Sequence, residues 1–123
     1  MVSRYEFELP WPVSTNRYWR HVGHYTLLSR EARRYHMMAV SRLSGMKPLE
    51  GELSLTAHFY PPDRRRRDLD NVGGKCLIDS MVKAGLMHDD EQIKRIHLEM
   101  LEPMQGGKVF VVLEPLVRNK DNG

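Results

Sequence analysis

The residues of this chain that could do chemistry together are two aspartates, one residue apart, directly after a run of four arginines. They stand in the stretch DRRRRDLDNV at 63–72, which contains Arg64, Arg65, Arg66, Arg67, Asp68 and Asp70. In an extended segment residues i and i+2 point the same way, so we expect Asp68 and Asp70 to project together while Leu69 turns inward. Two carboxylates on one face can share Mg²⁺, which prefers oxygen ligands and takes only one or two protein carboxylates.

A second acidic pair, Asp89 and Asp90, follows a predicted helix. If that helix runs antiparallel to its neighbouring strands, the pair reaches Asp70 only when the following strand brings the chain back. Helix capping is the alternative role for an aspartate before a helix, although one cap needs only one residue. A calcium-binding loop is excluded, because Val72 occupies a ligand position and Asp79 stands where a bidentate glutamate is required.

The arginine run favours a partner that carries phosphate groups. Arginine grips phosphate oxygens with a planar fork, and cations bound to a nucleic-acid backbone release its counterions. Beside a metal site, the run therefore suggests a phosphodiester substrate; a solvated strand end that discourages aggregation is the alternative. Lys75 could stabilise negative charge that develops at phosphorus. Its alternative role is an ion-pair ladder with Asp79 and Lys83 along a helix.

Length and composition predict a single domain. The chain has 123 residues and a formal net charge of +3, which hints at an anionic partner. We expect the domain to span residues 1–117, with a frayed tail at 118–123. The single cysteine, Cys76, excludes an internal disulfide framework and fits a reducing cytosol. Neither a signal peptide nor a membrane-spanning stretch is evident, so a cytoplasmic location is expected.

The elements that must position these residues follow from hydrophobic periodicity. The predicted order is β-α-β-α-β-β, with strands near 4–9, 53–59, 95–100 and 109–113 and helices at 29–43 and 72–85. We expect Asp70 or Asn71 to cap the second helix and Gly85 to end it. Gly106-Gly107 should form the turn between the last two strands. The pattern predicts an α/β (α+β) fold with a mixed sheet of about four strands and two helices.

Residues 13–28 show no clean period and are expected to form a long polar, aromatic and cationic loop. Loops of this length in a small domain are more often functional than idle. Tyr18, Trp19 and Arg20 could stack on bases and bind phosphate, or could pack at a dimer interface.

Three segments together resemble the RusA family of bacterial and phage Holliday junction resolvases. They are LPWPVSTNRYWRH at 9–21, RRRRDLDN at 64–71 and LIDSMVKAGLMHDDEQI at 77–93. DLDN alone is a weak match, but DLDN with a downstream D-x-x-x-x-A-G-x-x-x-D-D is specific, and the likeness spans nearly the whole chain. The resemblance implies a homodimeric, Mg²⁺-dependent endonuclease, with Mn²⁺ as a substitute, that cuts four-way DNA junctions by paired symmetric nicks in recombination and repair.

The resemblance also implies which residues form the site. The family's catalytic residues fall on Asp68, Asp70, Lys75 and Asp90, and its metal ligands on Asp68, Asp70, Asp89 and Asp90. The spacing from Asp70 to Lys75 is five residues, where the family usually has four, and Gly73-Gly74 lies between them. An inserted residue that the glycines absorb is the simplest account.

The residues expected to hold the DNA are Asn16, Arg17, Arg20, Arg64, Arg65, Arg66 and Arg67. A two-fold dimer presents two identical sites, which matches the two equivalent strands to be cut in a four-way junction. Two alternatives stay open: a nuclease for flaps, forks or other branched phage DNA, and a non-catalytic accessory protein that binds junctions.

Overall fold

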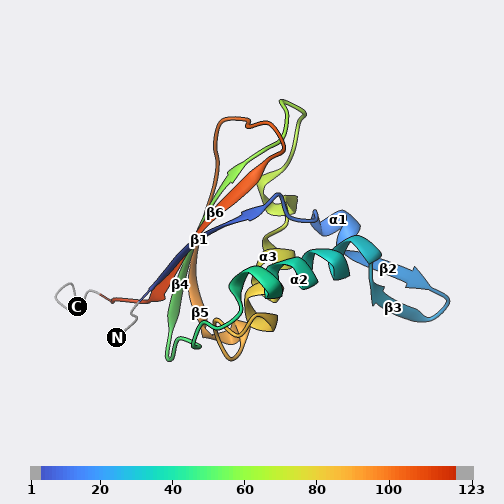
Figure 1. Cartoon of the computed structure of the whole chain (residues 1–123). Helices are drawn as coiled ribbons and strands as arrows, with labels where there is room; N and C mark the ends of the chain where they lie inside the picture. The colour runs from blue at the N-terminus through green and yellow to red at the C-terminus, as the bar shows by residue number, and fades with distance from the viewer. Residues whose placement is uncertain (1–3, 119–123) are drawn as a thin grey trace.

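The computed structural model describes residues 4–118, and Figure 1 shows a sheet with helices beside it and a projecting hairpin. The strands are β1 (Tyr5–Pro10), β2 (Trp19–Val22), β3 (Tyr25–Leu28), β4 (Leu53–Tyr60), β5 (Ile93–Met100) and β6 (Lys108–Pro115). The helices are α1 (Thr15–Tyr18), α2 (Arg30–Leu43) and α3 (Gly74–Lys83), with 3₁₀ turns η1 (Leu69–Asn71) and η2 (Asp90–Gln92). The predicted mixed four-stranded sheet is confirmed, and α1 adds a third helix to the two expected.

The main sheet has the strand order β1-β6-β4-β5. Strands β4 and β5 are parallel, whereas β6 is antiparallel to both β1 and β4. The apolar run at 109–113 thus lies in a central strand, which has a neighbour on each side. The predicted turn at Gly106-Gly107 between the last two strands is confirmed, although those strands do not pair, because β4 lies between β5 and β6. Both glycines still make a turn with positive φ angles of 83° and 70°.

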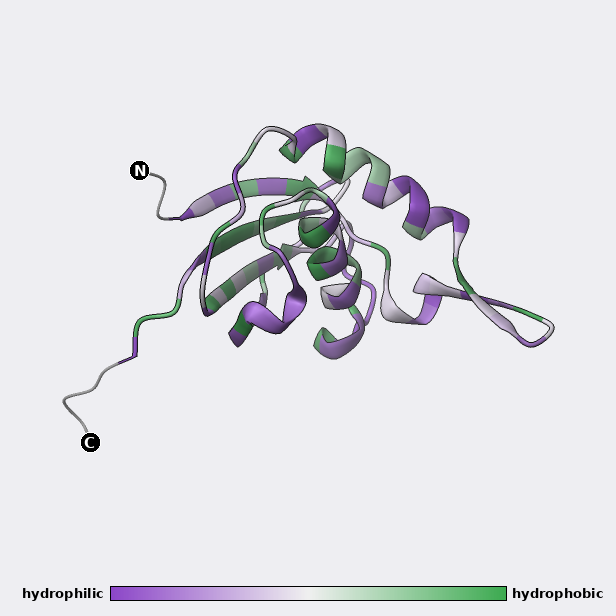
Figure 2. Ribbon diagram, turned by 90° about the horizontal axis from the view of Figure 1, so that it is seen from below, coloured by the Kyte–Doolittle hydropathy of each residue, from purple (hydrophilic) through white to green (hydrophobic). Residues whose placement is uncertain are grey.

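One face of the sheet forms the core with α2 and α3. Alternate residues of β4 are fully buried on this face, and they are Leu53, Leu55, Ala57 and Phe59. Helix α2 contributes Ala32, Tyr35, Ala39 and Leu43, and α3 contributes Cys76, Leu77 and Met81. Figure 2 shows the hydrophobic residues concentrated in the inner strands and α3. The alternation of apolar residues in β4 and their helical spacing in α2 and α3 therefore mark the side chains that pack together in one core.

Helix α3 connects the two parallel strands β4 and β5. A parallel pair requires such a crossover, so α3 carries the chain back from the end of β4 to the beginning of β5. The segment with Asp68 and Asp70 consequently follows the end of β4, whereas Asp89 and Asp90 precede the beginning of β5. The topology separates the two acidic pairs along the length of α3.

The start of α3 differs from the prediction. Residues 69–71 form the turn η1, so Asp68 and Asp70 are not in an extended segment and Leu69 is 38% exposed instead of turned inward. Neither Asp70 nor Asn71 caps α3, which begins after Gly73. The Asn71 side chain instead accepts a hydrogen bond from the backbone N–H of Asn16 at 3.0 Å.

Gly73 is required by its conformation and by its neighbours. Its φ is 119°, and a Cβ at this position would lie 2.8 Å from both Pro12 Cγ and the Val13 carbonyl oxygen. A side chain would therefore push the N-terminal segment away from α3. The other end of α3 is as predicted: Gly85 has a φ of 86°, and the N–H of Leu86 donates to the Met81 carbonyl.

The predicted loop at 13–28 is wrong, because it contains α1 and the antiparallel hairpin β2–β3. Every residue of β2 is exposed, so no alternation of buried and exposed residues marks the strand. Gly23, at φ 59°, occupies the first position of the two-residue turn, where a positive φ is needed. The pair Gly23-His24, between WRHV and YTLL, is the sequence feature that could have predicted this hairpin.

None of the helices within residues 4–118 is both long enough and apolar enough to cross a membrane. Most of the tail predicted to fray, 119–123, lies outside the described residues. Arg118, its first residue, pairs with Glu52 at 3.3 Å.

Candidate functional site

The arginine run divides into two kinds of side chain. Arg67 is only 19% exposed; it pairs with Asp63 at 2.9 Å and lies over the Trp11 ring, 5.6 Å from its centroid. It also donates to the carbonyl oxygens of Asp63 and Arg65, at 3.2 and 3.0 Å. The pKa of Asp63 is lowered, first by the Arg65 backbone N–H and also by the Arg67 guanidinium. Arg67 thus fixes the loop, whereas Arg64, Arg65 and Arg66 are exposed.

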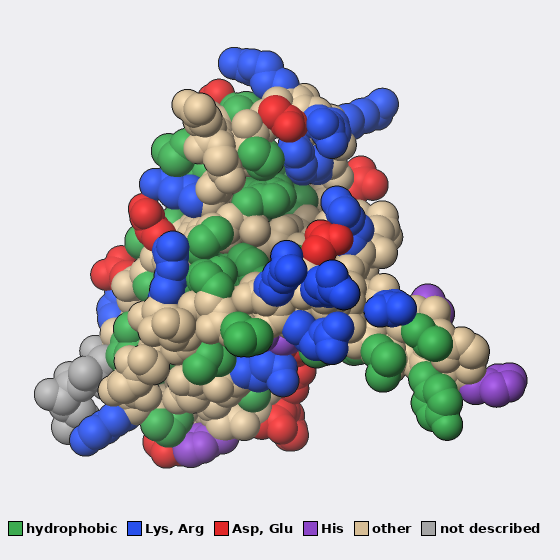
Figure 3. Space-filling view, turned by 45° about the vertical axis from the view of Figure 1, so that its right-hand side comes forward, with side chains coloured by type: hydrophobic (Ala, Val, Ile, Leu, Met, Phe, Trp, Pro, Cys, Tyr) green, Lys and Arg blue, Asp and Glu red, His purple; other side chains and the backbone are tan. Residues whose placement is uncertain are grey.

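A basic cavity of about 690 Å³ lies beside this loop. Its lining includes the predicted DNA-binding residues Asn16, Arg17, Arg65, Arg66 and Arg67, together with Asp68. Figure 3 shows Lys and Arg side chains gathered at the upper end and across the middle of one face. Exposed arginines of α2, namely Arg30, Arg33, Arg34 and Arg42, add cations that the sequence analysis did not consider. The structure therefore brings Asp68 together with most of the predicted phosphate-binding side chains.

Lys75 lies in the first turn of α3 and pairs with Asp79, one turn further along. Its Nζ is 3.3 Å from Asp79 Oδ1. Of the ion-pair ladder Lys75–Asp79–Lys83 considered for this helix, the Lys75–Asp79 pair is present. Within residues 4–118 no ion pair joins Asp79 to Lys83. The Asp79 carboxylate restricts where the Lys75 ammonium can lie.

Asp79 is itself held by a buried hydrogen-bond network. The Tyr18 hydroxyl donates to Asp79 Oδ2 at 2.5 Å and lies 3.0 Å from His36 Nε2. Burial, then the hydrogen bond to Asp79, raise the pKa of Tyr18, so the phenol keeps its proton and donates it to the carboxylate. Because the Tyr18 proton points to Asp79, His36 must donate from Nε2 to the Tyr18 oxygen. This network ties α1 and α2 to the aspartate that pairs with Lys75.

His36 is 4% exposed, and its Nδ1 is buried without a hydrogen-bond partner. Burial, followed by the charge of Lys83, lowers the pKa of His36, with Asp79 acting in the opposite direction. The imidazole is therefore neutral, with its proton on Nε2, and Nδ1 is an unpaired acceptor.

In the second acidic pair one carboxylate caps a turn and the other hydrogen-bonds to it. Asp89 caps η2, where it accepts from the Glu91 N–H at 2.8 Å, and the Gln92 side chain accepts from the Asp89 N–H at 3.1 Å. The pKa of Asp89 is lowered, first by the Glu91 N–H. The pKa of Asp90 is raised, first by the hydrogen bond it shares with Asp89, while the charge of Lys75 opposes the rise. Of the two carboxyl groups, Asp89 thus ionises more readily, and Asp90 is the one that holds a proton longer as the pH rises.

A second cavity, of about 460 Å³, joins these acids to the Tyr18 network. It is lined by Tyr18, Trp19, Leu28, Asp79, Val82, Lys83, Asp89 and Asp90. Asp68 thus lines the basic cavity and Asp89 and Asp90 line this one, whereas Asp70 and Lys75 line neither of the two. Lys75 pairs with Asp79 of the second cavity and acts on Asp90 through its charge.

The donor chemistry fits a hard divalent cation. The predicted metal ligands Asp68, Asp70, Asp89 and Asp90 supply only carboxylate oxygens, which Mg²⁺ prefers, and Mg²⁺ needs only one or two of them. Within residues 4–118 these four do not form a group of three whose ligand atoms lie within 4.8 Å of one another. His58, His97 and Glu99 do form such a group, on the strands β4 and β5.

The role considered for Tyr18 in stacking on bases is wrong, because its side chain is fully buried. Trp19 is 42% exposed and packs edge-on against Tyr18, with ring centroids 5.0 Å apart. Sequence reasoning also missed the link from Tyr18 and His36 to Asp79. The three residues are too far apart in the sequence for spacing to connect them.

Fold and site together are those of a class of protein, an α+β domain with a candidate carboxylate in a basic cavity and with a lysine fixed by an ion pair in the helix that follows, which suits an enzyme acting on phosphodiesters. Residues 10–114 match the family model described as "Endodeoxyribonuclease RusA". The chain belongs to the RusA family of endodeoxyribonucleases, as the resemblance in its sequence predicted.

Relatives of this family match along most of their length. The chain is 35% identical over 116 residues to the crossover junction endodeoxyribonuclease RusA of Escherichia coli (strain K12), an alignment covering 91% of this chain and 95% of that protein. It is 33% identical over 115 residues to the crossover junction endodeoxyribonuclease of Enterobacteria phage 82, covering 91% and 95%. It is 32% identical over 118 residues to that of Enterobacteria phage HK97, covering 94% and 98%.

Proposed function

We propose that this chain is a Mg²⁺-dependent, structure-selective endonuclease that resolves four-way DNA junctions by paired symmetric nicks, in homologous recombination and DNA repair. The observation that carries the proposal is the basic cavity in which Arg65, Arg66 and Asp68 meet, in a chain of the RusA family. Relatives in a bacterium and in two phages are named as crossover junction endodeoxyribonucleases. The expected site of action is the cytoplasm.

In the proposed mechanism the basic cavity binds the DNA backbone. The exposed arginines displace counterions from the DNA backbone and orient the strand; Arg65 does so from a long ion pair with Asp63, at 3.9 Å. Arg67 contributes indirectly, because it holds the loop in place through Asp63 and Trp11. Asn16 and Arg17 approach the same cavity from α1, and Arg17 is positioned by an ion pair with Glu31 at 2.9 Å.

Asp68, Asp70, Asp89 and Asp90 would hold the metal, as the family resemblance implies, and a single ion would take ligands from both pairs only if binding drew the two pairs together. When bound, Mg²⁺ supplies a Lewis acid for the phosphoryl oxygen and lowers the pKa of a bound water. Lys75, restrained by Asp79, stabilises the charge that develops at phosphorus. The charge of Lys75 opposes the rise in the pKa of Asp90 and so favours the ionised carboxylate that a metal ligand must be.

We propose that the active form is a homodimer, so that two identical sites face the two strands to be cut. Exposed apolar side chains on the hairpin and α2 support this, because a patch of this kind is commonly covered by a partner. They are Trp19, Val22, Tyr25, Leu27, Met37 and Val40.

The test is a Mg²⁺ titration of cleavage on a four-way junction, a fork and a linear duplex of the same sequence, with the cut positions mapped on both strands. We expect symmetric nicks on the junction, much faster than on the other two, and activity with Mn²⁺ as well. Equal rates on all three would identify a nuclease for flaps, forks or other branched DNA. Binding without any nick would identify a non-catalytic accessory protein.

A further inference from the structure

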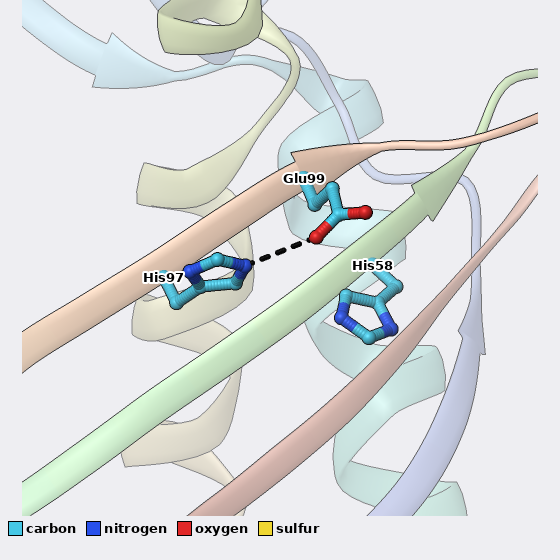
Figure 4. Close-up of side chains that lie close together, drawn as sticks. All are labelled: His58, His97 and Glu99. Carbon is cyan, nitrogen blue, oxygen red and sulfur yellow. Dashed lines mark hydrogen bonds and ion pairs between the residues drawn. The ribbon is translucent and has the colours of Figure 1, made fainter.

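The open face of the sheet, opposite α2 and α3, carries a cluster of His58, His97 and Glu99. One ligand atom from each of the three lies within 4.8 Å of the other two. Figure 4 shows the three side chains on the near side of β4 and β5, with the helices behind the sheet. We propose that this cluster is a second metal site, for Zn²⁺ or a metal of similar ligand preference, separate from the nuclease site.

The strand register builds the cluster. His58 of β4 pairs with Glu99 of β5, and Thr56 pairs with His97. Because successive residues of a strand point to opposite faces, His97 and Glu99 share one face with His58, while Ala57 and Phe59 point into the core. The three ligands are therefore presented by hydrogen-bonded strands and not by a mobile loop, which lowers the entropy cost of binding.

One of the three distances between ligand atoms already matches that around a bound metal, and the other two are no more than 4.8 Å. Ligand atoms about 2.0–2.2 Å from a tetrahedral Zn²⁺ lie roughly 3.3 Å apart. His97 Nε2 and Glu99 Oε1 already lie 3.1 Å apart. The rings of His58 and His97 have centroids 6.3 Å apart, and the His97 and Glu99 side chains are 59% and 50% exposed. Small rotations of the exposed His97 and Glu99 side chains toward His58 would bring the three ligand atoms to the spacing that a metal ion requires.

The donor set selects the metal. Two imidazole nitrogens and one carboxylate oxygen suit Zn²⁺ and its neighbours in the transition series, whereas Mg²⁺ prefers oxygen ligands alone. Three protein ligands leave a fourth position for water or for a group from a partner. The cluster thus differs from the carboxylate-only nuclease site in both chemistry and location.

A metal here would join the edge strand β5 to the central strand β4. Strand β5 pairs with β4 alone in the sheet. It directly follows Asp90 and η2. Because a ligand that binds only the folded state stabilises it, Zn²⁺ should raise the melting temperature.

The test is isothermal titration of ZnCl₂ into the full-length protein, together with melting curves. We expect one Zn²⁺ per chain and an upward shift of the melting temperature. His97→Ala should weaken binding roughly tenfold or more and abolish the shift. His97 is exposed, so this variant is expected to fold, and far-ultraviolet circular dichroism checks it. Glu99→Ala serves as the second variant.

Two control variants distinguish Zn²⁺ binding at this cluster from binding at the hairpin histidine or at the nuclease site. His24→Ala removes an exposed histidine from the hairpin and should leave Zn²⁺ binding unchanged. Asp90→Asn alters the proposed nuclease site and should also leave it unchanged. Zn²⁺ binding that is equal in the wild type and His97→Ala, or absent from the wild type, would overturn the proposal. Loss of Zn²⁺ binding in Asp90→Asn would also overturn it, since that metal would then occupy the nuclease site.

Discussion

Lys75 and Asp79, one turn apart on α3, form an ion pair with 3.3 Å between Nζ and Oδ1. The other carboxylate oxygen of Asp79 accepts the Tyr18 hydroxyl hydrogen bond. The lysine expected to act on the phosphate is therefore placed by a carboxylate that is itself fixed from α1. This arrangement makes Asp79 a positioning residue for Lys75.

Replacing Asp79 with asparagine tests that role. We expect Asp79→Asn to slow junction nicking about tenfold to a hundredfold, because small misplacements of a reacting group have costs of this size. Junction affinity, measured by gel shift, should be retained. Lys75→Ala should slow nicking at least as much, and the double variant should be no slower than Lys75→Ala alone. Additive losses in the double variant would show that Asp79 acts independently of Lys75.

The two adjacent glycines before Lys75 provide a matched pair. Gly73→Ala forces a side chain into a positive φ and against Pro12, so we expect it to lower the free energy of unfolding by about 1–3 kcal/mol. Gly74→Ala meets no atom closer than Leu98 Cδ1 at 3.8 Å and adds a helix-favouring residue, so it should be neutral or stabilising by up to about 1 kcal/mol. Urea unfolding measures both. Equal effects of the two substitutions would contradict the conformation described for Gly73.

His36 predicts a dependence of stability on pH. Its pKa in the folded protein lies below the ordinary value of 6.5, because burial disfavours the imidazolium. As the pH falls through about 6.5, the unfolded chain takes up a proton that the folded protein does not, so stability falls with a slope of at most about 1.4 kcal/mol per pH unit.

Urea unfolding at pH 7.5 and 5.5 checks this expectation. His36→Gln removes the titrating group and should make the loss of stability between the two pH values smaller. If the wild type and His36→Gln lost the same amount, His36 would not be the group responsible.

Arg66 and Arg67 are neighbours with different expected roles. Arg66→Ala should weaken junction binding and reduce the salt slope of log K by about one, without changing stability. Arg67→Ala should lower the free energy of unfolding by about 1–2 kcal/mol, because it removes the contacts with Asp63 and Trp11. Salt-dependent gel shifts and urea unfolding separate the two. If Arg66→Ala bound the junction as tightly as the wild type, Arg66 would not contact DNA, and the alternative role of the run, a solvated strand end that discourages aggregation, would be favoured.

The sequence was sufficient where local chemistry determined the structure. Ser29 caps α2 by accepting from the Ala32 N–H at 3.1 Å, and the alternation in β4 predicted its buried face. The hairpin β2–β3 was missed, because exposure on both sides leaves no period. The parallel pairing of β5 with β4 was not predicted, because no spacing in the sequence links two strands that a helix separates.

The same distinction applies to the site. The arginine run and Asp68 were recognisable because they are contiguous, and the structure places them in one cavity. The bond from Tyr18 to Asp79 spans 61 positions, and His58 and His97 lie on different strands. Only the packing of α1 against α3 and the register of β4 with β5 bring such residues together.

The central claim is that the aspartates after the arginine run serve metal-dependent cleavage and not DNA binding. The most direct measurement compares Mg²⁺-dependent nicking and binding of a four-way junction by the wild type and Asp70→Asn. We predict that the variant binds the junction with the wild-type affinity while nicking falls by about a hundredfold or more, since the carboxylate is needed only for the metal. Nicking by Asp70→Asn at the wild-type rate would contradict the account.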